Sequence, residues 1–130
     1  MSIELVVRDR TPGREDGELT LVDLPQRLTL RDLIRTRVRD EVARYNADRD
    51  GIFRGLVRPE GAEETARGFS VARDRVLDWE KQARVAERAF GENGFFVLVG
   101  GKQVLDLDSE LDLEVDTDIC FVRLVPLVGG

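Results

Sequence analysis

Two short segments near the start of the chain alternate between apolar and polar residues, which is the period of a half-buried β-strand. They are residues 2–8 and 18–22, and Pro12 and Gly13 lie between them, where the chain must reverse. The pattern therefore predicts that the chain begins with a β-hairpin. The positions expected to face a core are Ile3, Leu5, Val7, Leu19 and Leu21.

The apolar spacing then changes to the 3.6-residue period of an α-helix. Thr29 is a candidate N-cap, and Asp32 stands three residues later, where it can complete a capping box. The pattern predicts a helix that reaches Tyr45 and lies on a sheet. Its expected buried face consists of Leu30, Leu33, Ile34, Val38, Val42 and Tyr45.

The middle of the chain carries much less periodicity. Residues 46–69 are rich in glycine and proline in polar surroundings, which predicts a segment that is mainly loop. Ser70 is a candidate N-cap for a second helix and Gly91 a candidate stop. Trp79 would lie in the apolar stripe of this helix, a position more typical of core packing than of recognition. The expected stripe is Ala72, Val76, Trp79, Ala83, Ala86 and Phe90.

The last third of the chain returns to the strand pattern. Residues 94–107 indicate a strand, a Gly-Gly turn and a short strand, and residues 117–128 indicate a closing strand. The charge of Arg123 favours the opposite face of the closing strand as the core face. That face carries Cys120, Val122 and Leu124, and the acidic connector before it is expected to point Leu111, Leu113 and Val115 inward.

Composition limits the classes of function. The chain has 130 residues, of which 42% are hydrophobic, enough for one domain with a sizeable core. Twenty-six acidic and 20 basic residues give a net charge of -6, so nucleic acid is not an expected partner. No histidine is present, which removes the commonest general base and the commonest metal ligand. We therefore expect neither an enzyme nor a metal site.

One segment copies part of a calcium-binding motif. Asn46, Asp48 and Asp50 have the spacing of the first ligands of an EF-hand loop. Val57 stands where the bidentate glutamate of that loop belongs, so a loop that ends a helix is the better interpretation.

The expected location is cytoplasmic, with no membrane partner. No apolar run approaches the ~20 residues of a membrane span, and the N-terminus becomes charged too soon for a signal peptide. The single cysteine, Cys120, lies in an apolar run and is expected to be an inert buried thiol.

The order hairpin, helix, strand pair and final strand is that of the β-grasp fold, an α+β class in which one helix packs on a mixed sheet. Residues 95–130 resemble the C-terminal half of the ubiquitin family, and "GGKQV" occupies the position of that family's glycine-lysine-glutamine hairpin. The ending "VRLVPLVGG" is similar to the sulfur carriers of molybdopterin and thiamine biosynthesis. The resemblance implies a single ubiquitin-like domain over residues 1–130, with residues 46–94 as a loop-plus-helix insertion. A bacterial source with a compact modification pathway would fit such a chain.

The resemblance also implies a role for the tail, residues 126–130. An activating enzyme would use ATP to join AMP to the terminal carboxylate, so Gly130 would supply the acyl carbon and Gly129 a neighbour without a side chain. Conjugation to the amines of acceptor proteins would follow, with a conjugating enzyme and a deconjugating protease as further partners and no stably bound cofactor. The residues expected to thread the enzyme's channel as a flexible tail are Pro126, Leu127 and Val128.

Two alternatives remain open at this stage. A sulfur carrier would bear a thiocarboxylate at Gly130, and a non-covalent interaction domain would not use its tail. The family's hydrophobic recognition patch maps to the last strands, and Lys102 matches a lysine on which that family builds chains. The candidate patch is Leu98, Phe121, Val122 and Leu124, and the candidate chain acceptors are Lys102 and Lys81.

Overall fold

The computed structural model describes residues 2–13 and 15–124. The chain divides into two compact units, the first formed by Met1–Leu33 with Phe90–Gly130 and the second by Ile34–Ala89. The fold class is α+β, as the sequence predicts. Within the described residues, no helix has the length and apolar character needed to cross a membrane.

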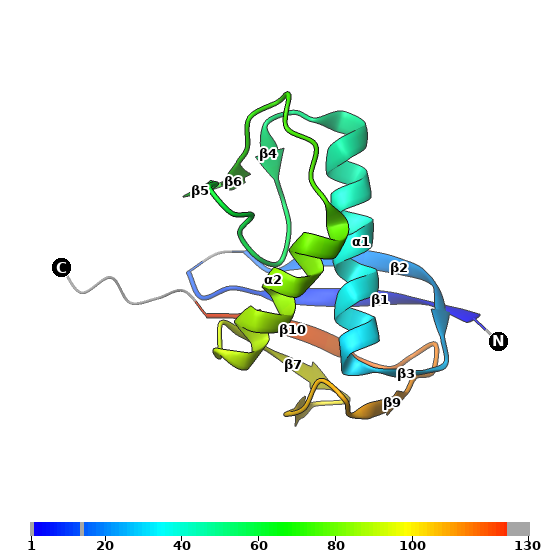
Figure 1. Cartoon of the computed structure of the whole chain (residues 1–130). Coiled ribbons are helices and arrows are strands. Elements are labelled where there is room, and N and C mark those ends of the chain that lie inside the picture. The colour runs from blue at the N-terminus through cyan, green and yellow to red at the C-terminus, as the bar shows by residue number, and fades with distance from the viewer. Residues whose placement is uncertain (1, 14, 125–130) are drawn as a thin grey trace. The chain divides into compact units, whose positions relative to one another are not determined.

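A mixed five-stranded sheet, called here the main sheet, organises the first unit (Figure 1). Its order is β2-β1-β10-β7-β8. The first and last strands of the chain lie side by side and run parallel, whereas the other neighbours are antiparallel. The strands are β1 (Ser2–Arg10), β2 (Gly17–Pro25), β7 (Phe95–Val99), β8 (Lys102–Val104) and β10 (Ile119–Arg123).

Both hairpins of the main sheet were predicted correctly. In the β1–β2 hairpin, Leu5 pairs with Leu21, and both side chains are buried. In the β7–β8 hairpin, Val99 pairs with Lys102 across a turn formed by two glycines. Gly100 and Gly101 have φ angles of 59° and 80°, the left-handed backbone that a tight two-residue hairpin turn requires.

The predicted core face of β10 is wrong. Ile119 and Phe121 are fully buried, whereas Val122 is half-buried and Leu124 is 45% exposed. Phe121 pairs with the buried Val97 of β7, which fixes its side chain on the inner face of the sheet. The charge of Arg123 misled the assignment because this residue ends the strand, where a long side chain can reach water from either face.

A second strand pair, β3 (Arg27–Thr29) with β9 (Glu110–Asp112), also belongs to the first unit. Leu111 and Leu113 are buried as expected, but Val115 is 75% exposed, so its inward placement is wrong. The reason is a turn that follows β9. The hydroxyl of Thr117 accepts a hydrogen bond from the backbone N–H of Glu114 at 2.7 Å, and the alternation of β9 does not continue through this turn.

The predicted first helix is confirmed as α1 (Leu30–Asp48), which extends three residues beyond Tyr45. The Thr29 hydroxyl accepts a hydrogen bond from the Asp32 backbone N–H at 3.1 Å, as expected of an N-cap. All six apolar side chains of the predicted face are buried. The same helix also buries Arg37 and Glu41, whose side chains form an ion pair at 3.3 Å. The spacing of apolar residues in the sequence does not predict such a buried ion pair.

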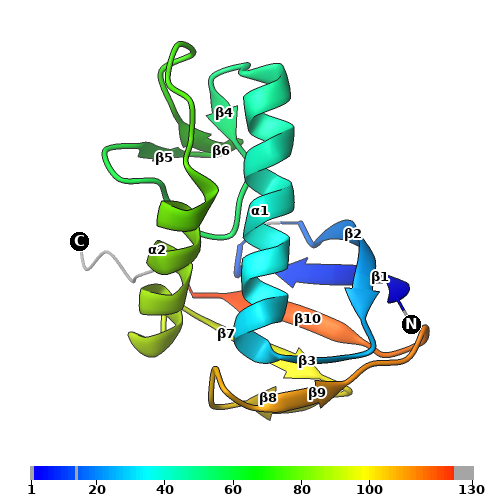
Figure 2. The same cartoon turned by 45° about the vertical axis from the view of Figure 1, so that its right-hand side comes forward.

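The second unit contains a small antiparallel sheet where the sequence predicts mainly loop (Figure 2). Its strands have only two or three residues, too few to show an alternation that can be recognised in the sequence. Phe53 pairs with Phe69, and both rings are buried. The strands, in the order β4-β6-β5, are β4 (Ile52–Phe53), β5 (Glu63–Thr65) and β6 (Gly68–Ser70).

The predicted start of the second helix is wrong. Ser70 ends strand β6, and α2 (Trp79–Gly91) begins nine residues later. Asp78 is the cap, because its Oδ1 accepts hydrogen bonds from the backbone N–H groups of Glu80 and Lys81 at 3.0 and 3.4 Å. The first two positions of the predicted stripe, Ala72 and Val76, are exposed. The predicted stop at Gly91 is confirmed.

Side chains of α1 hold the segment around the start of α2. The Asn46 amide accepts a hydrogen bond from the backbone N–H of Leu77 and donates one to its carbonyl, both at 2.9 Å. The guanidinium carbons of Arg35 and Arg39 lie 5.1 and 5.5 Å from the ring centre of Trp79. The Asn46 side chain therefore binds the backbone before α2 from the last turn of α1. This role accords with its interpretation as part of a segment that ends a helix. Trp79 is half-buried against these two arginines and does not belong to the buried core, so its predicted core packing is only partly confirmed.

We expect Gly68→Ala to destabilise the second unit by about 3 kcal/mol. Gly68 has a φ of 145°, and an added Cβ would lie 2.8 Å from the Phe53 carbonyl oxygen and 2.9 Å from Ile52 Cγ2. The matched control is Gly61→Ala, where φ is 79° and an added Cβ meets no atom within 4 Å. This control should lower the free energy of unfolding by about 1 kcal/mol, because it adds backbone strain alone. Urea unfolding followed by circular dichroism measures both, and equal losses would contradict the assigned contact.

Candidate functional site

The residues that the sequence assigns to adenylation and conjugation lie outside the described part of the chain. Strand β10 ends at Arg123, and Leu124 is the last residue that the structure describes. The assigned residues beyond this point are Pro126, Leu127, Val128, Gly129 and Gly130.

Val122, close in sequence to the tail, lies on the outer face of the main sheet. Residues that pair directly across strands point to the same face, so the strand register identifies which side chains lie together. One row crosses all five strands, with one residue from each. In sheet order from β2 to β8 it contains Glu18, Arg8, Cys120, Leu98 and Gln103.

The predicted recognition patch is only partly assembled on this face. Leu98 and Val122 are both half-buried and project from neighbouring strands, with Phe96 opposite Val122. Phe121 lies on the inner face with no exposed surface, so its assignment as an outward residue is wrong. Leu124 follows the end of β10 and donates a backbone hydrogen bond to the Gly94 carbonyl at 3.1 Å. The outer face therefore carries an apolar strip formed by Phe96, Leu98 and Val122.

The two lysines proposed as chain acceptors are both exposed. Lys102 is the first residue of β8, directly after the Gly-Gly turn of the main sheet. Lys81 lies in the first turn of α2, in the second unit. Both amines are thus open to solvent, as an acceptor amine must be.

An ion pair joins strand β1 to the loop that leads into β10. The Nε and Nη2 atoms of Arg8 donate hydrogen bonds to the two carboxylate oxygens of Asp118 at 3.0 and 2.9 Å. This bidentate geometry fixes both side chains more firmly than a single contact would. The two residues are 110 positions apart in sequence. The sequence does not predict this pair, because alternation identifies strands without showing which strands become neighbours.

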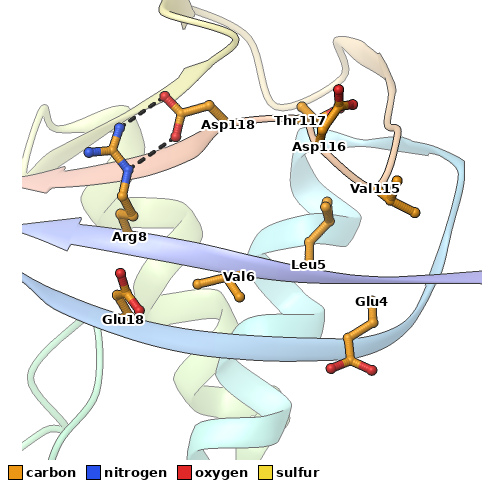
Figure 3. Close-up of a pocket in the computed structure, with 9 residues that line it drawn as sticks. All are labelled: Glu4, Leu5, Val6, Arg8, Glu18, Val115, Asp116, Thr117 and Asp118. Carbon is orange, nitrogen blue, oxygen red and sulfur yellow. Dashed lines mark hydrogen bonds and ion pairs between the residues drawn. The ribbon is translucent and has the colours of Figure 1, made fainter.

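A shallow depression of about 400 Å³ lies on the outer face next to this pair (Figure 3). Strands β1 and β2 line one side and the loop before β10 lines the other. Carboxylates dominate its charge, and Arg8 is the one cation among its lining residues. We call it the acidic depression. Its side chains include Glu4, Val6, Glu18, Val115, Asp116 and Asp118.

Cys120 lies between these features but is not accessible. Its side chain is 2% exposed, and burial raises the pKa of its thiol even though the positive charges of Arg8 and Arg10 act in the opposite direction. Within residues 2–13 and 15–124, no group of three or more cysteine or carboxylate side chains is placed to hold a metal ion.

We expect the native Cys120 thiol to react at least about tenfold more slowly with a disulfide reagent than the urea-unfolded chain does. Two causes act in the same direction, since burial blocks the approach of the reagent and the raised pKa lowers the fraction of thiolate at pH 8. Absorbance of the released thiol measures the rate, and the chain has no other cysteine to interfere. Equal rates in the folded and unfolded protein would contradict the buried placement.

Comparison of the chain with protein-family models, with curated proteins and with solved structures finds no match.

Proposed function

We propose that this chain is a ubiquitin-like protein modifier with a β-grasp fold, conjugated through its terminal glycine to amines of acceptor proteins. The observation that carries the proposal is the strand order β2-β1-β10-β7-β8, in which the first and last strands form a parallel pair at the centre of the sheet. A hairpin, a helix, a second hairpin and a final strand in this arrangement accord with the β-grasp layout.

The position of the last strand suits a reactive tail. Because β10 is held between β1 and β7, the chain leaves the sheet from a strand that is fixed on both sides. Six residues follow Leu124 in the sequence, and a fully extended segment of that length can reach about 20 Å. An activating enzyme would bind the rigid sheet. Gly129 and Gly130 have no side chains, so they would allow the enzyme to approach the backbone closely at the reacting end.

The proposed chemistry consists of one adenylyl transfer followed by two acyl transfers. The Gly130 carboxylate attacks the α-phosphorus of ATP, forming an acyl adenylate and releasing pyrophosphate. A thiolate of the activating enzyme attacks the acyl carbon and displaces AMP, giving a thioester. An acceptor amine then displaces the thiolate, loses a proton and forms an amide. Each catalytic group belongs to the partner enzymes, so this chain acts as substrate and needs no histidine of its own.

The apolar strip is the surface we assign to recognition by these partners. Phe96, Leu98 and Val122 are half-buried side by side on the outer face, and covering them would remove apolar surface from water. The exposed amines of Lys102 and Lys81 are the acceptors that chain formation would use.

A sulfur carrier is the second candidate, favoured by the similarity of "VRLVPLVGG" to such carriers. The adenylate would form in the same way, but a hydrosulfide ion would attack the acyl carbon and displace AMP. A thiocarboxylate would then stand at Gly130.

Mass spectrometry of the protein recovered from its native cells tests the proposal. The measurement follows the C-terminal peptide and asks what is bonded to the acyl carbon of Gly130. An amide bond to an acceptor lysine supports a modifier and names its targets, whereas sulfur in place of a carboxylate oxygen supports the carrier. A tail that always ends in an unmodified acid overturns both and leaves a non-covalent interaction domain.

A further inference from the structure

Two arginines and a tryptophan form a basic cluster in the second unit, called here the arginine–tryptophan cluster. Arg35 and Arg39 lie one turn apart on α1, and their guanidinium carbons are 5.1 and 5.5 Å from the ring centre of Trp79. Figure 2 shows the start of α2, where Trp79 lies, beside α1. Like charges four positions apart on a helix repel each other, whereas the indole attracts each guanidinium. The indole therefore gathers two positive charges at one place without neutralising them.

No carboxylate of the described chain neutralises this cluster. Within residues 2–13 and 15–124, the side chains of Arg35 and Arg39 form no ion pair or hydrogen bond, and the Trp79 indole N–H has no acceptor. The carboxylate next to Trp79 in sequence, that of Asp78, caps α2 instead. Other arginines of α1 do pair with carboxylates: Arg31 with Asp108, Arg37 with Glu41 and Arg44 with Asp40. The cluster is thus a set of donors that lacks acceptors.

The charge of the chain is divided unevenly between its two units. The second unit, Ile34–Ala89, contains 13 of the 20 basic residues but 11 of the 26 acidic residues. It is therefore net positive in a chain whose overall net charge is -6, and the first unit is strongly acidic. The first unit repels a negatively charged ligand and the second attracts it. Charge complementarity thus directs such a ligand to the unit that carries the cluster.

The chemistry of the cluster favours carboxylates as that ligand. A guanidinium that stacks on a ring keeps its N–H donors free in its own plane, and two of these donors fit the two oxygens of a carboxylate. Both guanidinium carbons lie within 5.5 Å of one ring centre, so they are no more than about 11 Å apart, and alternate residues of an extended segment project to the same side every ~7 Å. Two glutamates at alternate positions can therefore reach both arginines. A nucleic acid fits less well, because its long run of phosphates would meet the acidic first unit.

We propose that the arginine–tryptophan cluster is a docking site for an extended acidic segment of a partner protein, with carboxylate side chains at alternate positions. Arg35 and Arg39 each bind one carboxylate of the segment. Trp79 holds the two guanidiniums in position and leaves their planar donors available. The site makes no use of Gly130, so it goes beyond the proposed conjugation and stands or fails independently of it.

Nuclear magnetic resonance titration of the whole protein with the blocked peptide acetyl-Ala-Glu-Ala-Glu-Ala-amide tests the site. The chain has one tryptophan, so the indole N–H of Trp79 gives a single signal. We expect saturable shifts of this signal and of the Nε–H signals of Arg35 and Arg39, with an affinity that falls as salt is added. The matched peptide carries glutamine in place of glutamate, which keeps the shape and removes the charge. It should bind at least about tenfold more weakly.

A pair of double variants separates the cluster from the overall charge of the second unit. Arg35→Gln with Arg39→Gln should weaken binding of the glutamate peptide at least about tenfold. Neither side chain is fully buried, so this variant should keep its fold, which circular dichroism checks. The control removes the same charge from two exposed arginines of the same unit and should bind as the native protein does. It carries Arg58→Gln and Arg67→Gln.

Three outcomes would overturn the proposal. Equal binding of the glutamate and glutamine peptides by the native protein would remove the charge recognition. Equal weakening in both double variants would reduce the binding to an effect of net charge. Sodium phosphate alone, shifting the same signals and displacing the peptide at equal ionic strength, would identify a phosphate site instead.

Discussion

Removal of Gly129 and Gly130 should abolish every covalent adduct of this protein and leave its unfolding temperature unchanged. The truncated chain still ends in a carboxylate, but that carboxylate would belong to Val128, whose branched side chain opposes passage through a channel shaped for glycine. Stability should persist because all described core side chains lie at or before Phe121. Immunoblots of cells that express the truncated or the full chain measure the adducts, and circular dichroism measures unfolding.

The control for this truncation removes acceptor amines and keeps the tail. Lys81→Arg with Lys102→Arg preserves charge at two exposed positions and leaves the N-terminal amine as the protein's own acceptor. This variant should still modify other proteins but lose adducts in which one copy is joined to a lysine of another. Adducts that survive the truncation would show that the tail is not the point of attachment and would refute the modifier and the carrier together.

The sequence predicted the long and strongly patterned elements of this fold. The first hairpin has nine-residue strands, and α1 has both a cap and a continuous apolar face, so local signals at each agree with the tertiary structure. The small sheet of the second unit was missed for the opposite reason. Its two- and three-residue strands depend on pairing with distant segments, and two residues cannot display a period.

Errors in α2 and β10 came from rules that several residues satisfied equally well. Ser70 and Asp78 are both acceptable N-caps, and only the hydrogen bonds to Glu80 and Lys81 identify Asp78. In β10 both faces are apolar over Ile119 to Val122, as expected for a strand held between two neighbours at the centre of a sheet, so alternation could not identify the core face.

The candidate sites differ in the same way. The tail can be read directly from the sequence, because its chemistry requires consecutive residues. The acidic depression cannot be read from the sequence, because it forms only when β1 and the loop before β10 become neighbours. Arg8 and Asp118 are 110 positions apart, so no local pattern predicts their contact. Surfaces built by strand pairing therefore require the structure, whereas a linear motif does not.

Phe121→Ala should destabilise the protein by about 3 to 5 kcal/mol, whereas Val122→Ala should cost less than about 1 kcal/mol. Phe121 is fully buried, and its ring centre lies 6.1 Å from that of Phe95, so truncation leaves a cavity on the inner face. Val122 is half-buried on the outer face opposite Phe96, so its truncation removes much less buried apolar surface. Urea unfolding measured by circular dichroism gives both free energies.

The same pair of variants distinguishes packing from recognition. If the apolar strip binds partner enzymes, Val122→Ala should reduce conjugate formation in a protein of nearly native stability, whereas losses in Phe121→Ala should follow its unfolded fraction and recover at lower temperature. The reverse order of stabilities would place Val122 in the core and Phe121 in solvent. That result would restore the face that the charge of Arg123 suggested and would remove the apolar strip as a recognition surface.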